Sequence, residues 1–165
     1  MEMTGQSKGS ESAVRGLAVI FLAIIVSGAS VAQEAAAPLA QADERYSQER
    51  KRLIENSLQL NPAEAERFWP VYAQFEKDLF DITERRRAMI AKFGENYDGM
   101  TDDMARQLIA DRLQLEEARA RLRKKYLPRF EKILPVKKLA RYYQIESKIN
   151  ASVDAGIAEE LPLIK

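Results

Sequence analysis

The side chains that could carry chemistry in this chain are carboxylates, bases and aromatic rings, because the sequence contains no histidine and no cysteine. Without imidazole or thiol groups, a nucleophile–imidazole pair, a reactive thiolate and a zinc site of the usual ligand types are excluded. Glu116, Glu117 and the acids between residues 76 and 84 are close enough in sequence to act as paired carboxylates or weak oxygen ligands. The same spacing is typical of a solvated helix face, and we adopt this interpretation. The sequence therefore predicts a non-enzymatic protein without catalytic residues, metal ligands or a cofactor.

Residues 118–149 form the most unusual stretch in charge, because eleven bases stand against two acids and aromatic rings are interleaved with them. The whole chain has a formal net charge of +1, so its overall charge does not indicate a nucleic-acid partner. Outside the cytoplasm, a basic and aromatic stretch predicts binding to anionic lipid head groups or to unfolded, acidic and aromatic client proteins. The candidate client-binding residues are Arg121, Lys125 and Arg129. In the alternative interpretation, acids of a neighbouring helix neutralise the stretch.

The first 32 residues have the pattern of a signal peptide. Lys8 and Arg15 precede an apolar run at residues 17–26, and small side chains occupy the −3 and −1 positions before Gln33. The run is shorter than the roughly 20 residues that a membrane-spanning helix requires. We expect cleavage before Gln33 and localisation to the periplasm. An uncleaved inner-membrane anchor and a plain core helix are the alternatives.

The remainder of the sequence predicts an all-α protein, with a disordered spacer at residues 33–42 and a single helical domain at residues 43–165. Its organising element is a long helix within residues 60–93, in which one side repeats at spacings of four and three. These seam residues are Phe68, Tyr72, Phe75, Leu79, Ile82, Arg86, Met89 and Phe93. Arg86 is the one charged member, and its head either extends to solvent or meets an acid across a dimer interface.

Local signals mark the start of this helix and two positions where helices bend. Asn61 can cap the first turn, Pro62 fits the first helical position, and Glu64 completes a capping box. Pro70 in this helix and Pro128 in a later one each remove a backbone hydrogen bond, so we expect bends without breaks at both positions.

Three further helices complete the prediction. A short helix at residues 43–58 comes before the long one, and a second long helix follows with Thr101 as its cap. The apolar stripe of the second long helix contains Met104, Leu108, Leu115, Leu122, Tyr126, Phe130 and Ile133. Antiparallel pairing that places residue i near residue 195 − i would set the acids of residues 62–84 against the bases of residues 111–133. A last helix begins after Leu134-Pro135.

Two short motifs in this chain resemble a known signature. The segments RKRLIENSLQLNPAEAERFWPVY and ILPVKKLARYYQIESKI are similar to the Spy/CpxP-like periplasmic helical proteins, especially to relatives with a Phe-Trp-Pro element. That family carries two copies of a Leu-Thr-x-x-Gln motif, and Glu64 and Lys138 replace both glutamines here. The matching positions are Leu60, Asn61, Pro62, Glu64, Phe68, Trp69, Tyr72, Leu134, Pro135, Lys138, Arg141, Tyr142 and Tyr143.

The resemblance implies a long, kinked antiparallel helical hairpin with short flanking helices, which dimerises into a curved cradle. It also implies an ATP-independent chaperone or envelope-stress protein that binds unfolded or membrane-protein clients as a homodimer. A regulatory partner of a membrane sensor or anti-sigma factor is the alternative within the same family. The metal-sensing members use histidine ligands, which this chain lacks.

Overall fold

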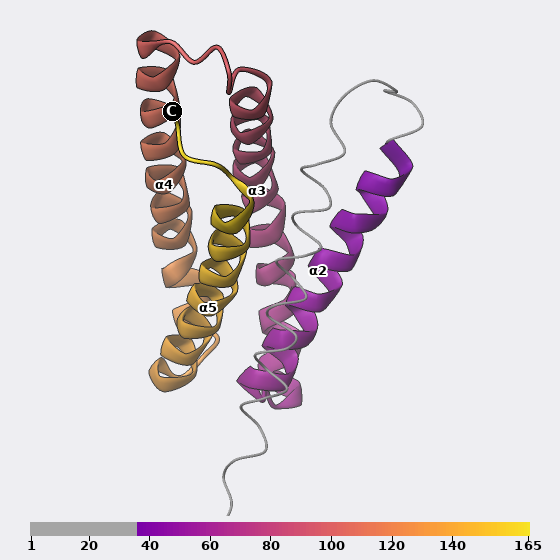
Figure 1. Ribbon diagram of the computed structural model, residues 1–165. Helices are drawn as coiled ribbons and strands as arrows, with labels where there is room; N and C mark the ends of the chain where they lie inside the picture. Colours follow the sequence, from indigo (N-terminus) through magenta and orange to yellow (C-terminus); the bar gives the residue numbers. More distant parts are fainter. Residues whose placement is uncertain (1–35) are drawn as a thin grey trace, which may run out of the picture. The chain divides into compact units, whose positions relative to one another are not determined.

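The computed structural model describes residues 36–165, and every regular element in that range is an α-helix, as the sequence predicted (Figure 1). The helices are α2 (Ala36–Leu58), α3 (Pro62–Glu95), α4 (Asp102–Glu131) and α5 (Val136–Glu160). The predicted signal peptide lies outside the described residues. Helix α2 is described from Ala36, so it includes most of the segment expected to be a disordered spacer, in which the alanines have high helix propensity. No helix within residues 36–165 combines the length and apolar character needed to cross a membrane.

The described chain groups into two compact units, and each is considered separately. The first unit contains α2 and the part of α5 from Ala140 onward. The second contains α3, α4 and the first turn of α5, within Leu60–Leu139, together with Ile164–Lys165. The single helical domain predicted for residues 43–165, its bends and its dimer stay predictions.

Helix α3 buries almost the whole predicted seam. Its buried residues are Phe68, Tyr72, Phe75, Leu79, Ile82, Arg86, Ile90 and Phe93. Ile90 is buried where the seven-residue series predicted Met89, which is only partly buried. A straight α-helix drifts by about 20° per heptad relative to a 3.5-residue repeat. After three heptads this drift moves the buried side by one residue, which explains the single error.

Aromatic rings make close contacts between α3 and α4, which lie side by side (Figure 1). Ring centroids are 5.3 Å apart for Phe68 and Phe130, and 5.4 Å apart for Phe75 and Tyr126. All four side chains are buried. Early residues of α3 therefore contact late residues of α4. The pairing differs from the expected register, which opposed Phe68 to Leu127 and not to Phe130.

Both long helices begin with the predicted caps. Asn61 Oδ1 accepts from the backbone N–H of Glu64, and the Glu64 carboxylate accepts from the backbone N–H of Asn61, at 2.9 Å each. The Thr101 hydroxyl accepts from the backbone N–H of Met104 at 3.3 Å. Pro70 and Pro128 lie inside α3 and α4, and both helices continue past them.

The unit formed by α2 and α5 has its own apolar contacts and one buried ion pair. Leu53 and Ile149 are buried against each other, and Tyr46 and Ile145 pack at their edge. An ion pair joins the guanidinium of Arg50 on α2 to the carboxylate of Glu146 on α5, and both side chains are almost fully buried. Sequence reasoning did not anticipate this pair.

Candidate functional site

A shallow groove on the α3–α4 unit contains two of the three candidate client-binding residues. We call it the charged groove, and it has a volume of about 420 Å³. Its lining residues are Asp78, Asp81, Ile82, Ala118, Arg121, Leu122 and Lys125. The floor is aliphatic and the walls carry charges of both signs, so the groove differs from the purely basic surface that the sequence suggested.

Asp78 organises one wall of the charged groove. Its Oδ2 atom accepts from Lys125 Nζ at 2.7 Å and from the Tyr126 hydroxyl at 2.8 Å. These two hydrogen bonds lower the pKa of Asp78 below its ordinary value. The bond to Asp78 raises the pKa of Lys125 in turn. Burial, followed by the bond to Asp78, raises the pKa of the Tyr126 phenol. At neutral pH the group is therefore a carboxylate held by an ammonium and a neutral phenol.

The three candidate bases have different partners. Lys125 pairs across the helices with Asp78, whereas Arg121 pairs with Glu117 on its own helix at 3.1 Å. The Arg129 guanidinium lies over the Tyr126 ring, 4.8 Å from its centroid, in a cation–π contact. Of the three bases, Lys125 is therefore the one whose charge is neutralised by an acid of the neighbouring helix, as the alternative interpretation of the sequence expected.

The two family-motif copies meet at one ion pair. Lys138 Nζ donates to Glu64 Oε2, the same oxygen that accepts from the Asn61 backbone. These two residues are the fifth positions of the two similar segments that begin at Leu60 and Leu134. The hydrogen bond from Lys138, followed by the one from Asn61, lowers the pKa of Glu64. The motif residues thus serve a structural role in which a capped helix start is joined to the start of α5.

The aromatic motif residues fall into two groups. Phe68, Trp69 and Tyr72 lie together at the start of α3, with ring centroids of Trp69 at 5.1 Å from Phe68 and 5.5 Å from Tyr72. Phe68 and Tyr72 are buried, while Trp69 is partly buried. Tyr142 and Tyr143 contact each other at 5.5 Å.

The remaining motif positions have no shared site. Leu134 is buried and Leu60 is partly buried, whereas Pro62, Pro135 and Arg141 are exposed. Arg141, Tyr142 and Tyr143 belong to the α2–α5 unit, and the other motif residues belong to the α3–α4 unit.

Sequence reasoning missed a second apolar side of α4. We call it the outward stripe, and its residues are Ile109, Leu113, Ala120 and Leu127. Ile109 is 61% exposed, Leu113 is 59% exposed, and Ala120 and Leu127 are exposed too. Their spacings of four and seven residues place them on one side of a helix, turned away from buried residues such as Leu115 and Leu122. The seven-residue spacing of Leu113, Ala120 and Leu127 is present in the sequence, but the longer series of apolar residues on the buried side of α4 was taken as the packed side.

Within residues 36–165 there is no group of three or more His, Cys, Asp or Glu side chains arranged to hold a metal ion. No protein-family model, curated protein or solved structure matches this chain.

Proposed function

We propose that this protein is a non-enzymatic, ATP-independent binding protein that shields apolar segments of unfolded proteins in the periplasm. The observation that carries the proposal is the outward stripe of α4. Three large aliphatic side chains on one side of the helix are exposed to solvent, Ile109 and Leu113 by more than half and Leu127 by about a third. Removing apolar surface from water is favourable by roughly 25 cal/mol per Å². Such a stripe is therefore suited to bind an apolar client segment.

Charges of both signs flank the stripe. Lys124 is exposed and lies between Ala120 and Leu127 on the same side of α4, whereas the exposed Glu116 lies between Leu113 and Ala120. A client whose charged residues complement these around an apolar segment would be attracted from a distance and then held by apolar contact. The attraction weakens with salt, because the screening length is about 8 Å at physiological ionic strength and about 3 Å near 1 M.

The proposal includes a kinked helical hairpin that dimerises into a cradle, as the family resemblance implies. Phe80 on α3 is 50% exposed, which supports a further apolar contact beyond the α3–α4 unit. Light scattering at tens of micromolar should give twice the chain mass, and a strict monomer would contradict this part of the proposal.

Aggregation of a chemically reduced, unfolded client protein, followed by turbidity without nucleotide, tests the binding proposal. The variant Ile109→Gln/Leu113→Gln/Leu127→Gln should lose most of the protection, because it removes the stripe while leaving buried residues intact. The matched control is Val136→Gln/Leu163→Gln, since Val136 and Leu163 are exposed aliphatic residues outside the stripe. The control should protect as well as the original chain.

Two outcomes would overturn the binding proposal. In the first, the stripe variant retains its circular dichroism spectrum and still protects the client. In the second, it becomes monomeric while protection persists, which would make the stripe a dimer interface and not a client surface.

The proposed periplasmic localisation has its own test. Intact-mass analysis of protein extracted from the cell envelope should place the N-terminus at Gln33, after removal of residues 1–32. Full-length chain in the membrane fraction would favour the anchored alternative.

A further inference from the structure

The methionines within residues 36–165 gather in one place. The sequence has five methionines, and Met1 and Met3 are in the N-terminal segment. The other three, Met89, Met100 and Met104, come from the end of α3, the connecting turn and the first turn of α4, and all three line the same pocket. We call it the methionine pocket. Every methionine of the described residues is therefore in its wall.

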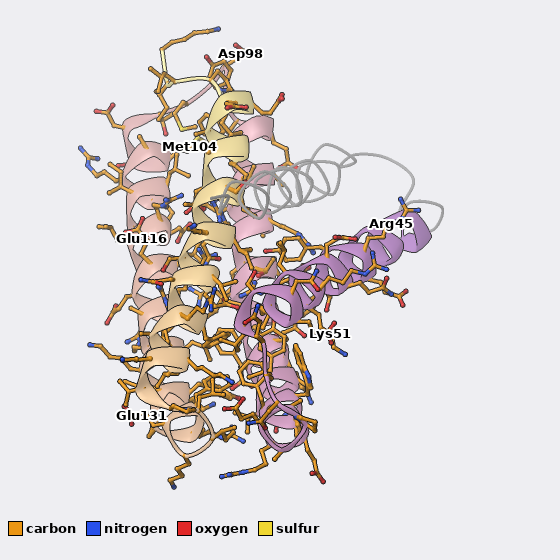
Figure 2. All side chains as sticks on the ribbon, turned by 90° about the horizontal axis from the view of Figure 1, so that it is seen from below. Arg45, Lys51, Asp98, Met104, Glu116 and Glu131 are labelled. Atoms are coloured by element: carbon orange, nitrogen blue, oxygen red, sulfur yellow. The ribbon has the colours of Figure 1, made fainter. Side chains whose placement is uncertain are left out.

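The pocket is at the end of the α3–α4 unit where the two helices are connected, near the labelled side chains Met104 and Asp98 in Figure 2. Its volume is about 20 Å³. A space of this size holds a single water molecule or a single ion, since one water needs at least about 10–15 Å³. Met104 is 37% exposed, and Met89 and Met100 are partly buried, so an ion can enter from solvent.

The donor atoms in the methionine pocket favour a soft ion. Thioether sulfur is a soft, neutral ligand that selects Cu(I) among biological metals. Oxygen donors are fewer than a hard ion requires: Asp111 is the only carboxylate in the wall, one of its oxygens accepts from Gln107 Nε2 at 2.8 Å, and Asn96 and Gln107 add one amide oxygen each. Calcium takes six to eight oxygen ligands, and zinc takes mainly thiolate, imidazole or carboxylate ligands. Neither ion is matched by this wall.

Charge restricts the ion further. The wall contains the ammonium of Lys92 as well as the carboxylate of Asp111, so the two titratable groups that line the pocket cancel. Three neutral thioethers leave the charge of a bound ion unchanged. A monovalent ion therefore meets less repulsion from Lys92 than a divalent ion does.

We propose that Met89, Met100 and Met104 form a binding site for Cu(I) at this end of the α3–α4 unit. The proposal stands independently of the client-binding proposal, because the pocket and the outward stripe share no residue. The competing explanation is that the methionines only fill space beside Phe93, for which their flexible side chains are also suited. Space filling requires volume but no sulfur, and this difference can be measured.

Silver(I) is the probe, because it is a soft monovalent ion like Cu(I) and does not change oxidation state in air. Titration of the full chain in chloride-free buffer, followed by calorimetry and native mass spectrometry, should show one tight site. The variant Met89→Leu/Met100→Leu/Met104→Leu preserves the apolar volume and removes all three sulfurs. Its affinity should fall by more than about tenfold, since even outer-shell changes cost metal sites about 10–100-fold. Val136→Leu, an apolar change at an exposed position outside the pocket, is the control and should bind silver as the original chain does.

A second measurement uses the unmodified sequence and does not depend on the folding of a variant. Hydrogen peroxide oxidises accessible methionine to its sulfoxide, and peptide mass spectrometry reports each position. Silver should slow oxidation at Met89, Met100 and Met104, whereas sodium at the same concentration should not. Three results would overturn the proposal: equal silver affinity in a triple variant with an unchanged circular dichroism spectrum, equal oxidation rates with and without silver, or equally tight binding of zinc(II).

Discussion

Lys138 donates to the carboxylate of Glu64, and these two side chains occupy equivalent positions in the two motif copies of the chain. The two side chains form an ion pair. The same carboxylate also completes the capping box of α3. Glu64 therefore takes part in a charge interaction and in a helix cap at once.

This pair predicts a pH dependence of folding. The pKa of Glu64 is held below its ordinary value of 4.5 in the folded chain by Lys138 and Asn61. A lowered folded pKa gives stability that is present above the ordinary value and lost as pH falls through the lowered one. Urea midpoints should therefore fall between pH 6 and pH 3. Glu64→Gln should lower the midpoint at pH 6 and reduce its dependence on pH, because glutamine can still accept from the Asn61 backbone.

Asp78 contributes to the same pH dependence with the same sign, since its pKa is also lowered. Glu64→Gln/Asp78→Asn should therefore flatten the acid side of the curve further than either change alone. Glu66→Gln, at an exposed acid next to the motif, is the control and should follow the original chain. A Glu64→Gln curve that coincides with the original curve at every pH would contradict the role of the pair.

The cap of α3 can be tested against the cap of α4. Asn61→Ala removes the acceptor for the Glu64 amide and should lower the free energy of unfolding by about 0.5–2 kcal/mol. Thr101→Ala is the matched variant at the other helix start and should have an effect of similar size. Urea denaturation measures both, with oligomeric state checked by light scattering. No measurable loss for Asn61→Ala would mean that the capping interaction does not stabilise α3.

The buried pair of Arg50 and Glu146 predicts a strong coupling. Glu146→Leu leaves the Arg50 guanidinium buried without its carboxylate and should cost about 3–5 kcal/mol of unfolding free energy. Arg50→Leu/Glu146→Leu replaces both charges with apolar groups and should be close to neutral. A double-mutant cycle by urea denaturation gives the coupling. If the unfolding free energies lost by Glu146→Leu and by Arg50→Leu add up in the double variant, the two side chains are not energetically coupled.

Charge reversal in the charged groove separates its structural role from client binding. Arg121→Glu/Lys125→Glu/Arg129→Glu should lower the melting temperature, because Lys125 bonds to Asp78 and Arg129 covers the Tyr126 ring. Adding Asp78→Lys to Lys125→Glu restores opposite charges across the helices and should recover part of the stability lost by Lys125→Glu alone. If the triple reversal melts like the original chain but loses client protection, the basic residues bind clients directly.

The sequence predicted helical elements and their packed sides well, because both follow from local periodicity. It identified seven of the eight buried seam residues of α3 (Phe68, Tyr72, Phe75, Leu79, Ile82, Arg86 and Phe93) and both caps. It failed at features that depend on which helices meet. The pairing of Arg50 with Glu146 joins residues 96 positions apart, and no local pattern specifies it.

The candidate site was predicted less well than the fold. Sequence reasoning left open whether Lys125 binds clients or pairs with an acid of the neighbouring helix, since the partner helix and its register decide which acid it meets. It also assigned Met104 to the buried stripe of α4, whereas the side chain is exposed at the methionine pocket. The confinement of three methionines to residues 89–104 was visible in the sequence, but their convergence depends on the turn between α3 and α4.

Pro70 and Pro128 have a joint consequence because they lie at the same level of the two helices. Phe68 and Phe130 are in ring contact, Pro70 follows Phe68 by two residues, and Pro128 precedes Phe130 by two. Each proline removes the donor for the carbonyl four residues earlier. Each helix of the α3–α4 unit thus lacks one internal backbone hydrogen bond near the level at which Phe68, Phe75, Tyr126 and Phe130 make ring contacts. Packing of the rings should therefore protect the backbone amides near Pro70 and Pro128 from hydrogen exchange. Replacing Phe130 with Ala should speed amide exchange near both prolines.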